Sequence, residues 1–178
     1  PRLPDITLRF LVPADAHAHA DEPPTLSALL PVSIRPLHRE LAGKRTLLFG
    51  VPSPFSPDCN DHLGTFIRTS SLLGEHGIDR ILGVATEDVF VMHAWSQAHN
   101  LTGKRGEVTL ASDGNGELCR RLNLSIDLSD EIMGARRRFR RFVMLVERDL
   151  SISRYALEPD DGTAVAVTSA VQVLGWFQ

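Results

Sequence analysis

Short apolar runs alternate with amphipathic segments through the middle of this sequence. Residues 46–51 (TLLFGV) and 80–85 (RILGVA) are continuous apolar runs, as in strands that are covered on both faces. Between them, apolar residues recur at helical spacing from Asp58 onward, and Gly77 is a natural helix stop. Residues 87–99 predict a second helix, and the acidic residues at its start are typical of a helix N-terminus. Strands that alternate with helices in this way indicate an α/β or α+β sandwich around a mixed sheet.

The remaining elements follow from similar patterns. We predict strands at 5–12, 107–112, 142–147 and 151–157, the last two as a hairpin, and a short helix at 116–122. Thr168 and Ser169 can cap a last helix that runs through Trp176. With no internal repeat or linker, residues 1–178 are predicted to form one domain, with 1–40 as a peripheral N-terminal strand and loop.

Composition limits the function classes. The 178 residues are 43% hydrophobic, enough for a real core, and 19 Lys and Arg against 22 Asp and Glu give a net charge of −3. This balance does not favour nucleic acid or an anionic membrane as partner, and the basic run 136–141 is interpreted as a solvated turn with Arg141 facing inward. No apolar stretch approaches the ~20 residues of a membrane span. We expect a cytoplasmic protein, or an organellar one if a targeting segment preceded Pro1.

The two cysteines, Cys59 and Cys119, are too few for a disulfide scaffold. If a helix begins near Pro57, Cys59 lies in its first turn, where free backbone N–H groups and the helix dipole favour the thiolate. A free thiol is about 3% ionised at pH 7, so full ionisation gains at most ~30-fold in rate. Further donors are needed, and the Ser56 hydroxyl and an arginine from 136–141 could supply them.

These residues carry a family resemblance. Pro52-x-x-x-Ser56-x-x-Cys59 resembles the peroxiredoxin active-site pattern Pro-x-x-x-Thr/Ser-x-x-Cys, and FGVPSPFSPDCNDHL, VFVMHAW, RRFVMLVE and EPDDGT are similar to its type-five, or plant type-two, branch. The resemblance implies a thioredoxin-like fold with an added N-terminal hairpin, no metal or organic cofactor, and commonly a homodimer. It implies an antioxidant thiol peroxidase of hydrogen peroxide and organic hydroperoxides, in which a cysteine sulfenate forms and a thiol reduces it.

The resemblance also implies roles by position. Cys59 would be the peroxidatic nucleophile, Ser56 would hydrogen-bond the peroxide and the thiolate, Pro52 would shield the sulfur, and Arg141 would bind developing charge. Branch members with a resolving cysteine usually carry it at places that correspond here to Gly83 and Val167. We therefore expect glutathione, a glutaredoxin or a thioredoxin as reductant, with Cys119 as resolver the minority alternative. Asp58, at a usually neutral position, is expected to point to solvent.

Other interpretations of these residues remain open. Cys59-x-x-His62 is a two-ligand fragment and a weak metal signal, so His62 is expected to pack or hydrogen-bond in the helix. His17, His19 and Asp21 are more typical of a surface loop than of a metal site. Phe90 and Trp95 are expected in the core, and Phe55 could line an apolar collar around the thiol. The competing function is a catalytically weakened redox-sensing or interaction module, and a thiol–disulfide oxidoreductase is weaker still.

Overall fold

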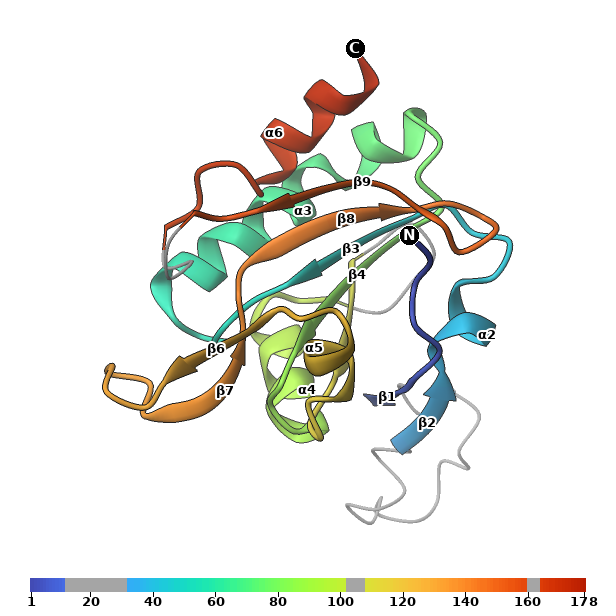
Figure 1. Cartoon of the computed structure of the whole chain (residues 1–178). Coiled ribbons are helices and arrows are strands. Elements are labelled where there is room, and N and C mark those ends of the chain that lie inside the picture. Colours follow the sequence, from blue (N-terminus) through green and yellow to red (C-terminus); the bar gives the residue numbers. More distant parts are fainter. Residues whose placement is uncertain (12–31, 102–107, 160–163) are drawn as a thin grey trace, which may run out of the picture.

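The computed structural model describes residues 1–11, 32–101, 108–159 and 164–178, and Figure 1 shows a twisted sheet with helices packed on both faces. Seven strands form the sheet in the order β2-β1-β5-β4-β3-β8-β9. Their bounds are β1 Thr7–Leu11, β2 Val32–Pro36, β3 Thr46–Gly50, β4 Arg80–Ala85, β5 Val108–Ser112, β8 Phe142–Val146 and β9 Ile152–Leu157. A separate ribbon pairs β6 (Ser125–Leu128) with β7 (Ala135–Phe139).

The centre of the sheet is mixed, as predicted. Strand β4 pairs in parallel with β3 and β5, whereas β8 pairs antiparallel with β3 and with β9. All five residues of β3 and all five of β8 are buried, which is why both read as continuous apolar runs. The predicted hairpin at 142–157 is therefore confirmed.

Helices cover the two faces unequally. The helices are α2 (Leu37–Leu41), α3 (Pro57–Glu75), α4 (Val89–Ala98), α5 (Glu117–Arg121) and α6 (Ala170–Leu174), and a 3₁₀ turn, η1 (Gly175–Phe177), follows α6. One core packs α3, α4 and α6 on one face of the sheet, and the other core packs α2, α5 and the N-terminal residues on the opposite face. The last helix is capped as expected, since the Ser169 hydroxyl accepts from the backbone N–H of Gln172.

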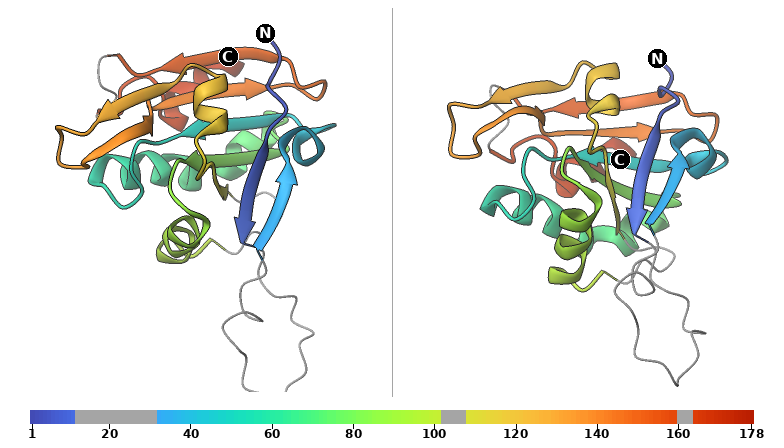
Figure 2. Two further views of the ribbon diagram at one scale, coloured as in Figure 1. Left: turned by 60° about the horizontal axis from the view of Figure 1, so that its bottom comes forward. Right: turned by 90° about the horizontal axis from the view of Figure 1, so that it is seen from below.

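The N-terminal hairpin lies at the edge of the sheet. Strand β1 pairs antiparallel with β2 and touches β5 through a single pair, Arg9 with Ser112. Leu8 and Phe10 are buried in the core on the α5 face. Figure 2 shows this hairpin well apart from the β6–β7 ribbon. The expected surface loop with His17, His19 and Asp21 lies outside the described residues.

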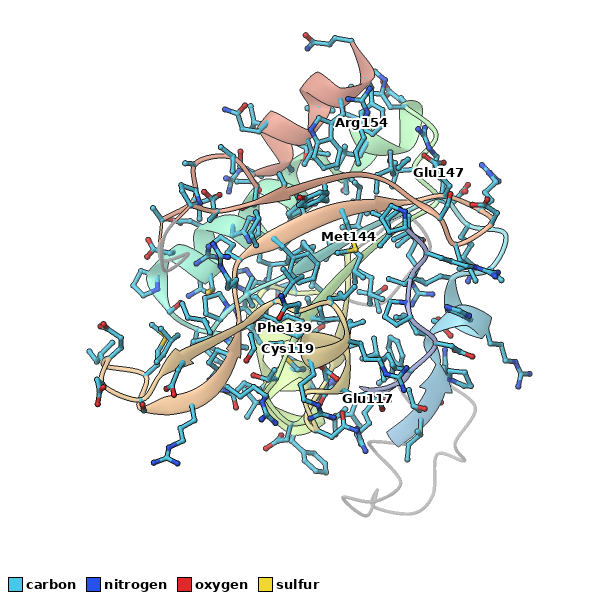
Figure 3. All side chains as sticks on the ribbon, viewed as in Figure 1. Glu117, Cys119, Phe139, Met144, Glu147 and Arg154 are labelled. Atoms are coloured by element: carbon cyan, nitrogen blue, oxygen red, sulfur yellow. The ribbon has the colours of Figure 1, made fainter. Side chains whose placement is uncertain are left out.

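The interpretation of 136–141 as a turn is wrong for most of the run. Residues Ala135–Phe139 form strand β7, because its pairing with β6 satisfies the backbone while Arg136 and Arg137 remain exposed. Phe139 is buried against the core that contains Cys119, and both are labelled in Figure 3. The Cys119 thiol donates to the Arg138 carbonyl oxygen at 3.5 Å.

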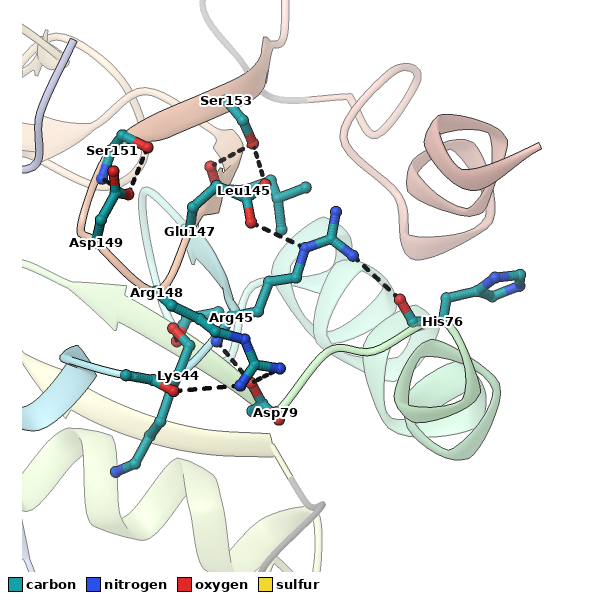
Figure 4. Close-up of polar contacts among 12 residues, drawn as sticks. Lys44, Arg45, His76, Asp79, Leu145, Glu147, Arg148, Asp149, Ser151 and Ser153 are labelled. Carbon is teal, nitrogen blue, oxygen red and sulfur yellow. Dashed lines mark hydrogen bonds and ion pairs between the residues drawn. The ribbon is translucent and has the colours of Figure 1, made fainter.

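A polar network fixes the amino end of β3 (Figure 4). The Arg45 guanidinium donates to the Glu147 carboxylate at 3.0 Å and to the His76 carbonyl at 3.2 Å, which joins the start of β3 to the β8–β9 turn and to the end of α3. The Asp79 carboxylate accepts from the Arg45 backbone N–H at 2.8 Å and pairs with Arg148 at 2.9 Å. The opposite, carboxyl end of β3 leads into the loop that carries Pro52 and Ser56.

Candidate active site

The link from β3 to α3 holds the proline, serine and cysteine of the sequence pattern. Pro52 is buried, Ser56 is the N-cap residue, and α3 begins at Pro57, so Cys59 is the third helical residue, as predicted. The Ser56 hydroxyl makes no capping hydrogen bond, although serine is a common capping residue. That hydroxyl is therefore available to a ligand beside the start of the helix.

The Cys59 side chain is fully buried, with an exposed fraction of 0%. Backbone N–H groups in the first turn of a helix have no partner within the helix, and together with the helix dipole they favour an anion there. Asp58 is exposed, in agreement with the expectation that its carboxylate faces solvent. The sulfur therefore lies in a site that favours negative charge and excludes bulk water.

Arg141 brings a cation to the sulfur from a distant part of the sequence. It follows β7 and precedes β8, is only 1% exposed, and donates from Nη2 to Cys59 Sγ at 3.4 Å. Its neighbour Arg140 instead donates to the Glu158 carbonyl oxygen at 3.1 Å. The inward residue of the basic run is thus Arg141, as expected, and it is 82 positions from the cysteine in sequence.

His62, expected from the sequence to pack or hydrogen-bond in the helix, contacts the arginine that binds the sulfur. Arg141 Nη1 lies 3.3 Å from His62 Nδ1, and His62 Nε2 lies 2.9 Å from the Thr168 carbonyl oxygen. Because a carbonyl only accepts, Nε2 carries the proton and Nδ1 accepts from Arg141. Burial, aided by the charge of Arg141, lowers the pKa of His62 to about 4, against opposing contributions from Thr168 and Glu158.

The spacing of Cys59 and His62 is the signal that could have identified this role. Residues three apart on a helix share a face, so a partner of the sulfur can reach both side chains. Phe49 and Phe66 stack on each other at 4.4 Å and both meet the imidazole edge-to-face, each with a ring centroid 5.3 Å from it. His62 is therefore held neutral against two stacked phenyl rings, with its Nδ1 lone pair directed at Arg141.

Glu158 fixes the segment that orients His62. One of its carboxylate oxygens accepts from the backbone N–H groups of Ala166, Val167 and Thr168 and from the Thr168 hydroxyl, at 2.7–2.9 Å. Burial alone would raise the pKa of the Glu158 carboxyl, but these hydrogen bonds outweigh it and the pKa is lowered. A continuous series of contacts therefore runs from Glu158 through Thr168, His62 and Arg141 to the sulfur.

Cys119 lies on the other face of the sheet. Cys59 belongs to the core under α3 and α4, whereas Cys119 belongs to the core under α5. Burial raises the pKa of the Cys119 thiol to about 11, so it is protonated at neutral pH. A disulfide requires Cα atoms within about 7 Å, which a sheet between the two cysteines does not permit. This placement argues against Cys119 as the resolving thiol.

Gly83 and Val167, the two positions that the resemblance suggested for a resolving cysteine, carry no thiol. A Cβ atom on Gly83 would lie 2.5 Å from Phe49 Cζ and 2.7 Å from Leu110 Cδ2, so these side chains fill the space of a larger residue. Val167 is 43% exposed in the segment that Glu158 holds. Within the described ranges, no group of three or more His, Cys, Asp or Glu residues could hold a metal ion.

Comparisons with known proteins agree with this geometry. The Redoxin family model matches residues 35–174. Peroxiredoxin-2E-2, chloroplastic, from Oryza sativa subsp. japonica is 36% identical over 174 residues, which cover 97% of this chain and 69% of that protein. Peroxiredoxin-2D from Arabidopsis thaliana is 34% identical over 170 residues, which cover 95% of this chain and 96% of that protein.

Solved structures show the same fold. Reduced Prx3 from Vibrio vulnificus in complex with H2O2 matches with a TM-score of 0.79 and 25% identity, over 100% of this chain and 97% of that one. Peroxiredoxin 5 from Alvinella pompejana matches with a TM-score of 0.73 and 24% identity, over 100% and 96%. The mixed sheet with flanking helices is thus the expected thioredoxin-like fold. The matches to the Redoxin model and to the plant peroxiredoxins cover most of this chain, which holds a buried cysteine at a helix start beside an arginine. The chain belongs to the redoxin family and, within it, to the peroxiredoxins, which are thiol peroxidases.

Proposed function

We propose that Cys59 is the peroxidatic nucleophile and that this chain reduces hydrogen peroxide and small organic hydroperoxides. The observation that carries the proposal is the contact between Arg141 Nη2 and Cys59 Sγ, 3.4 Å, at the N-terminus of α3. A buried guanidinium and a helix dipole both favour the thiolate, which is the nucleophilic form of cysteine.

In the first step the thiolate attacks the terminal oxygen of the peroxide. The S–O bond forms as the O–O bond breaks, the sulfur is oxidised to a sulfenic acid, and the leaving oxygen takes a proton and departs as water or an alcohol. Negative charge moves from sulfur to the leaving oxygen. Arg141 is placed to follow that charge, because its second nitrogen is already held by His62 and the guanidinium need not reorient.

Ser56 and Pro52 complete the proposed site. The Ser56 hydroxyl, free of a capping role, would donate to or accept from the bound peroxide. Pro52 is buried in the loop before the helix, where it would keep water from the sulfur. Phe55 is 48% exposed, so its ring lies at the protein surface rather than in a closed collar.

We propose an external thiol as reductant, with glutathione, a glutaredoxin and a thioredoxin as the specific candidates. The support is the absence of a suitable second thiol in the described residues: Cys119 is on the far face of the sheet, and Gly83 leaves no room for a side chain. Peroxiredoxins are often dimeric, and a homodimer is our proposal for this chain.

The cytoplasmic expectation is not confirmed. Two relatives carry the word chloroplastic in their names, and this chain spans 69% and 66% of their lengths, whereas Peroxiredoxin-2B and Peroxiredoxin-2D carry no such word. An organelle is therefore the compartment that we propose to test first, by fractionation. No helix among the described residues is long and apolar enough to cross a membrane.

Stopped-flow measurement of peroxide consumption tests the function. Wild-type protein and Cys119→Ser should consume peroxide in the presence of glutathione far faster than free cysteine does, and Cys59→Ser should not. A wild-type rate no faster than that of free cysteine would instead support the redox-sensing module, which the relatives do not favour.

A further inference from the structure

The burial of Cys59 creates a requirement for opening. The sulfur is 0% exposed, and glutathione, which is much larger than hydrogen peroxide, must align its own sulfur with the S–O bond of the sulfenic acid. The first turn of α3 and the preceding loop must therefore move after oxidation. The contacts that hold this turn closed set how often it opens.

Asn60, the residue after the cysteine, makes the side-chain contacts that tie this turn to the neighbouring helix α4. Its Oδ1 accepts from Trp95 Nε1 at 2.7 Å and from His99 Nε2 at 2.9 Å. The indole N–H can only donate, which identifies the amide atom beside it as oxygen and requires His99 to donate as well. Trp95 is fully buried, so the amide is attached to a fixed point of the core.

The other end of the same amide holds the loop. Asn60 Nδ2 donates to the Phe55 carbonyl oxygen at 3.1 Å. Phe55 has a φ of 67°, a left-handed conformation that a bulky residue rarely adopts without support. The Asn60 cluster, defined as Asn60, Phe55, Trp95 and His99, thus joins a strained loop residue to α4 through one side chain adjacent to the sulfur.

We propose that Asn60 is a positioning residue that keeps the site closed while peroxide reacts, and that loss of its hydrogen bonds opens the site to the reducing thiol. The inference rests on the proposed role of Cys59. In the step concerned, the thiolate of glutathione attacks the Cys59 sulfur, a disulfide bond forms, the S–O bond breaks, and hydroxide leaves and takes a proton to become water. Sulfur of the sulfenic acid is reduced and that of glutathione is oxidised.

The Asn60→Ala variant distinguishes the oxidation of Cys59 by peroxide from the later attack of glutathione on the sulfenic acid. Alanine suits a helix, so the substitution removes the three hydrogen bonds without opposing the fold. One net hydrogen bond shifts an equilibrium by about fivefold, and three are lost, so the open fraction and the rate of mixed-disulfide formation should rise at least about tenfold. The closed form still dominates, so the rate of sulfenic acid formation with hydrogen peroxide should change less than about twofold.

Two further variants make the test specific. Trp95→Phe removes one donor and should accelerate the glutathione step less than Asn60→Ala does. The double variant should match Asn60→Ala, because Trp95 acts through the amide. Ile81→Val, near the amino end of β4, is the stability control: it lowers the melting temperature yet should leave the glutathione step unchanged.

Quenched-flow samples analysed by peptide mass spectrometry give both rates, and alkylation of reduced Cys59 by iodoacetamide reports opening without peroxide. An increase of about tenfold in the glutathione and alkylation rates of Asn60→Ala and the double variant, with a smaller increase in Trp95→Phe and none in Ile81→Val, supports the inference. Unchanged rates in Asn60→Ala, with normal oxidation of wild-type Cys59, overturn the role of Asn60 and leave the proposed function standing. A wild-type Cys59 that hydrogen peroxide does not oxidise overturns both.

Discussion

Protonation of His62 should oppose folding in mildly acidic solution. In the folded protein, burial and the facing Arg141 charge lower the pKa of this imidazole to about 4, whereas an exposed histidine titrates near 6.5. Between these two pH values, His62 is therefore protonated in the unfolded chain and neutral in the native state. By linkage, the contribution of His62 to stability is complete above pH 6.5 and is lost progressively as the pH falls to about 4.

The structure sets the size of this effect. At about 1.4 kcal/mol per tenfold change in the protonation equilibrium, the gap between 6.5 and about 4 corresponds to about 3 kcal/mol of unfolding free energy. This is a large share of the 5–15 kcal/mol that is typical of folded proteins. Most of it should be lost by about pH 4.5, and the loss from His62 should level off below pH 4.

Urea denaturation at a series of pH values from about 7 to 4 measures the effect, with His62→Gln as the control. The glutamine amide can donate to the Thr168 carbonyl and accept from Arg141, but it does not titrate. Contributions from other groups, including the Glu158 carboxylate, remain in both proteins and cancel in the difference. The wild-type free energy of unfolding should fall by about 3 kcal/mol more than that of His62→Gln. Parallel curves would refute the assignment of a neutral, buried His62.

Two substitutions test other parts of the site. Arg141→Lys keeps the charge but cannot span the Cys59 sulfur and the His62 ring together, so sulfenic acid formation, followed by quenched-flow mass spectrometry, should slow by about tenfold or more. An unchanged rate would remove the guanidinium from the mechanism. Gly50→Ala would place a Cβ atom 2.1 Å from the Phe142 ring beside Arg141, and should cost about 1–3 kcal/mol in urea denaturation and slow the same step. Stability equal to wild type would contradict the packing of that ring.

Local patterns were enough to predict the centre of the fold. The run 80–85 is strand β4 without a change of boundary, and the helix expected near Pro57 begins there. In both cases the apolar spacing within one element determines the outcome. The same reasoning failed at Phe90, which was expected in the core and is 59% exposed. Phe90 and Trp95 are five residues apart, about 140° around the helix, so both cannot face the sheet.

Local sequence patterns could not predict the contacts between segments that are distant in sequence. The ribbon that contains β7 has few apolar residues and is recognisable only from its pairing with β6 and from the burial of Phe139. The position of Cys59 follows from a local motif, but the contact of His62 with Thr168 joins residues 106 positions apart. The family pattern therefore predicted which cysteine and which arginine lie together, and not the hydrogen bonds that hold them.

The most direct test of the central claim is the chemical state of each cysteine after one equivalent of hydrogen peroxide. Reduced protein is mixed with peroxide, quenched at successive times, and mapped by peptide mass spectrometry. We predict that one oxygen appears on Cys59 much faster than on free cysteine and that Cys119 remains a thiol; added glutathione should then convert the sulfenic acid to a mixed disulfide. Oxidation of Cys119 before Cys59, or a Cys59 rate equal to that of free cysteine, would contradict the account.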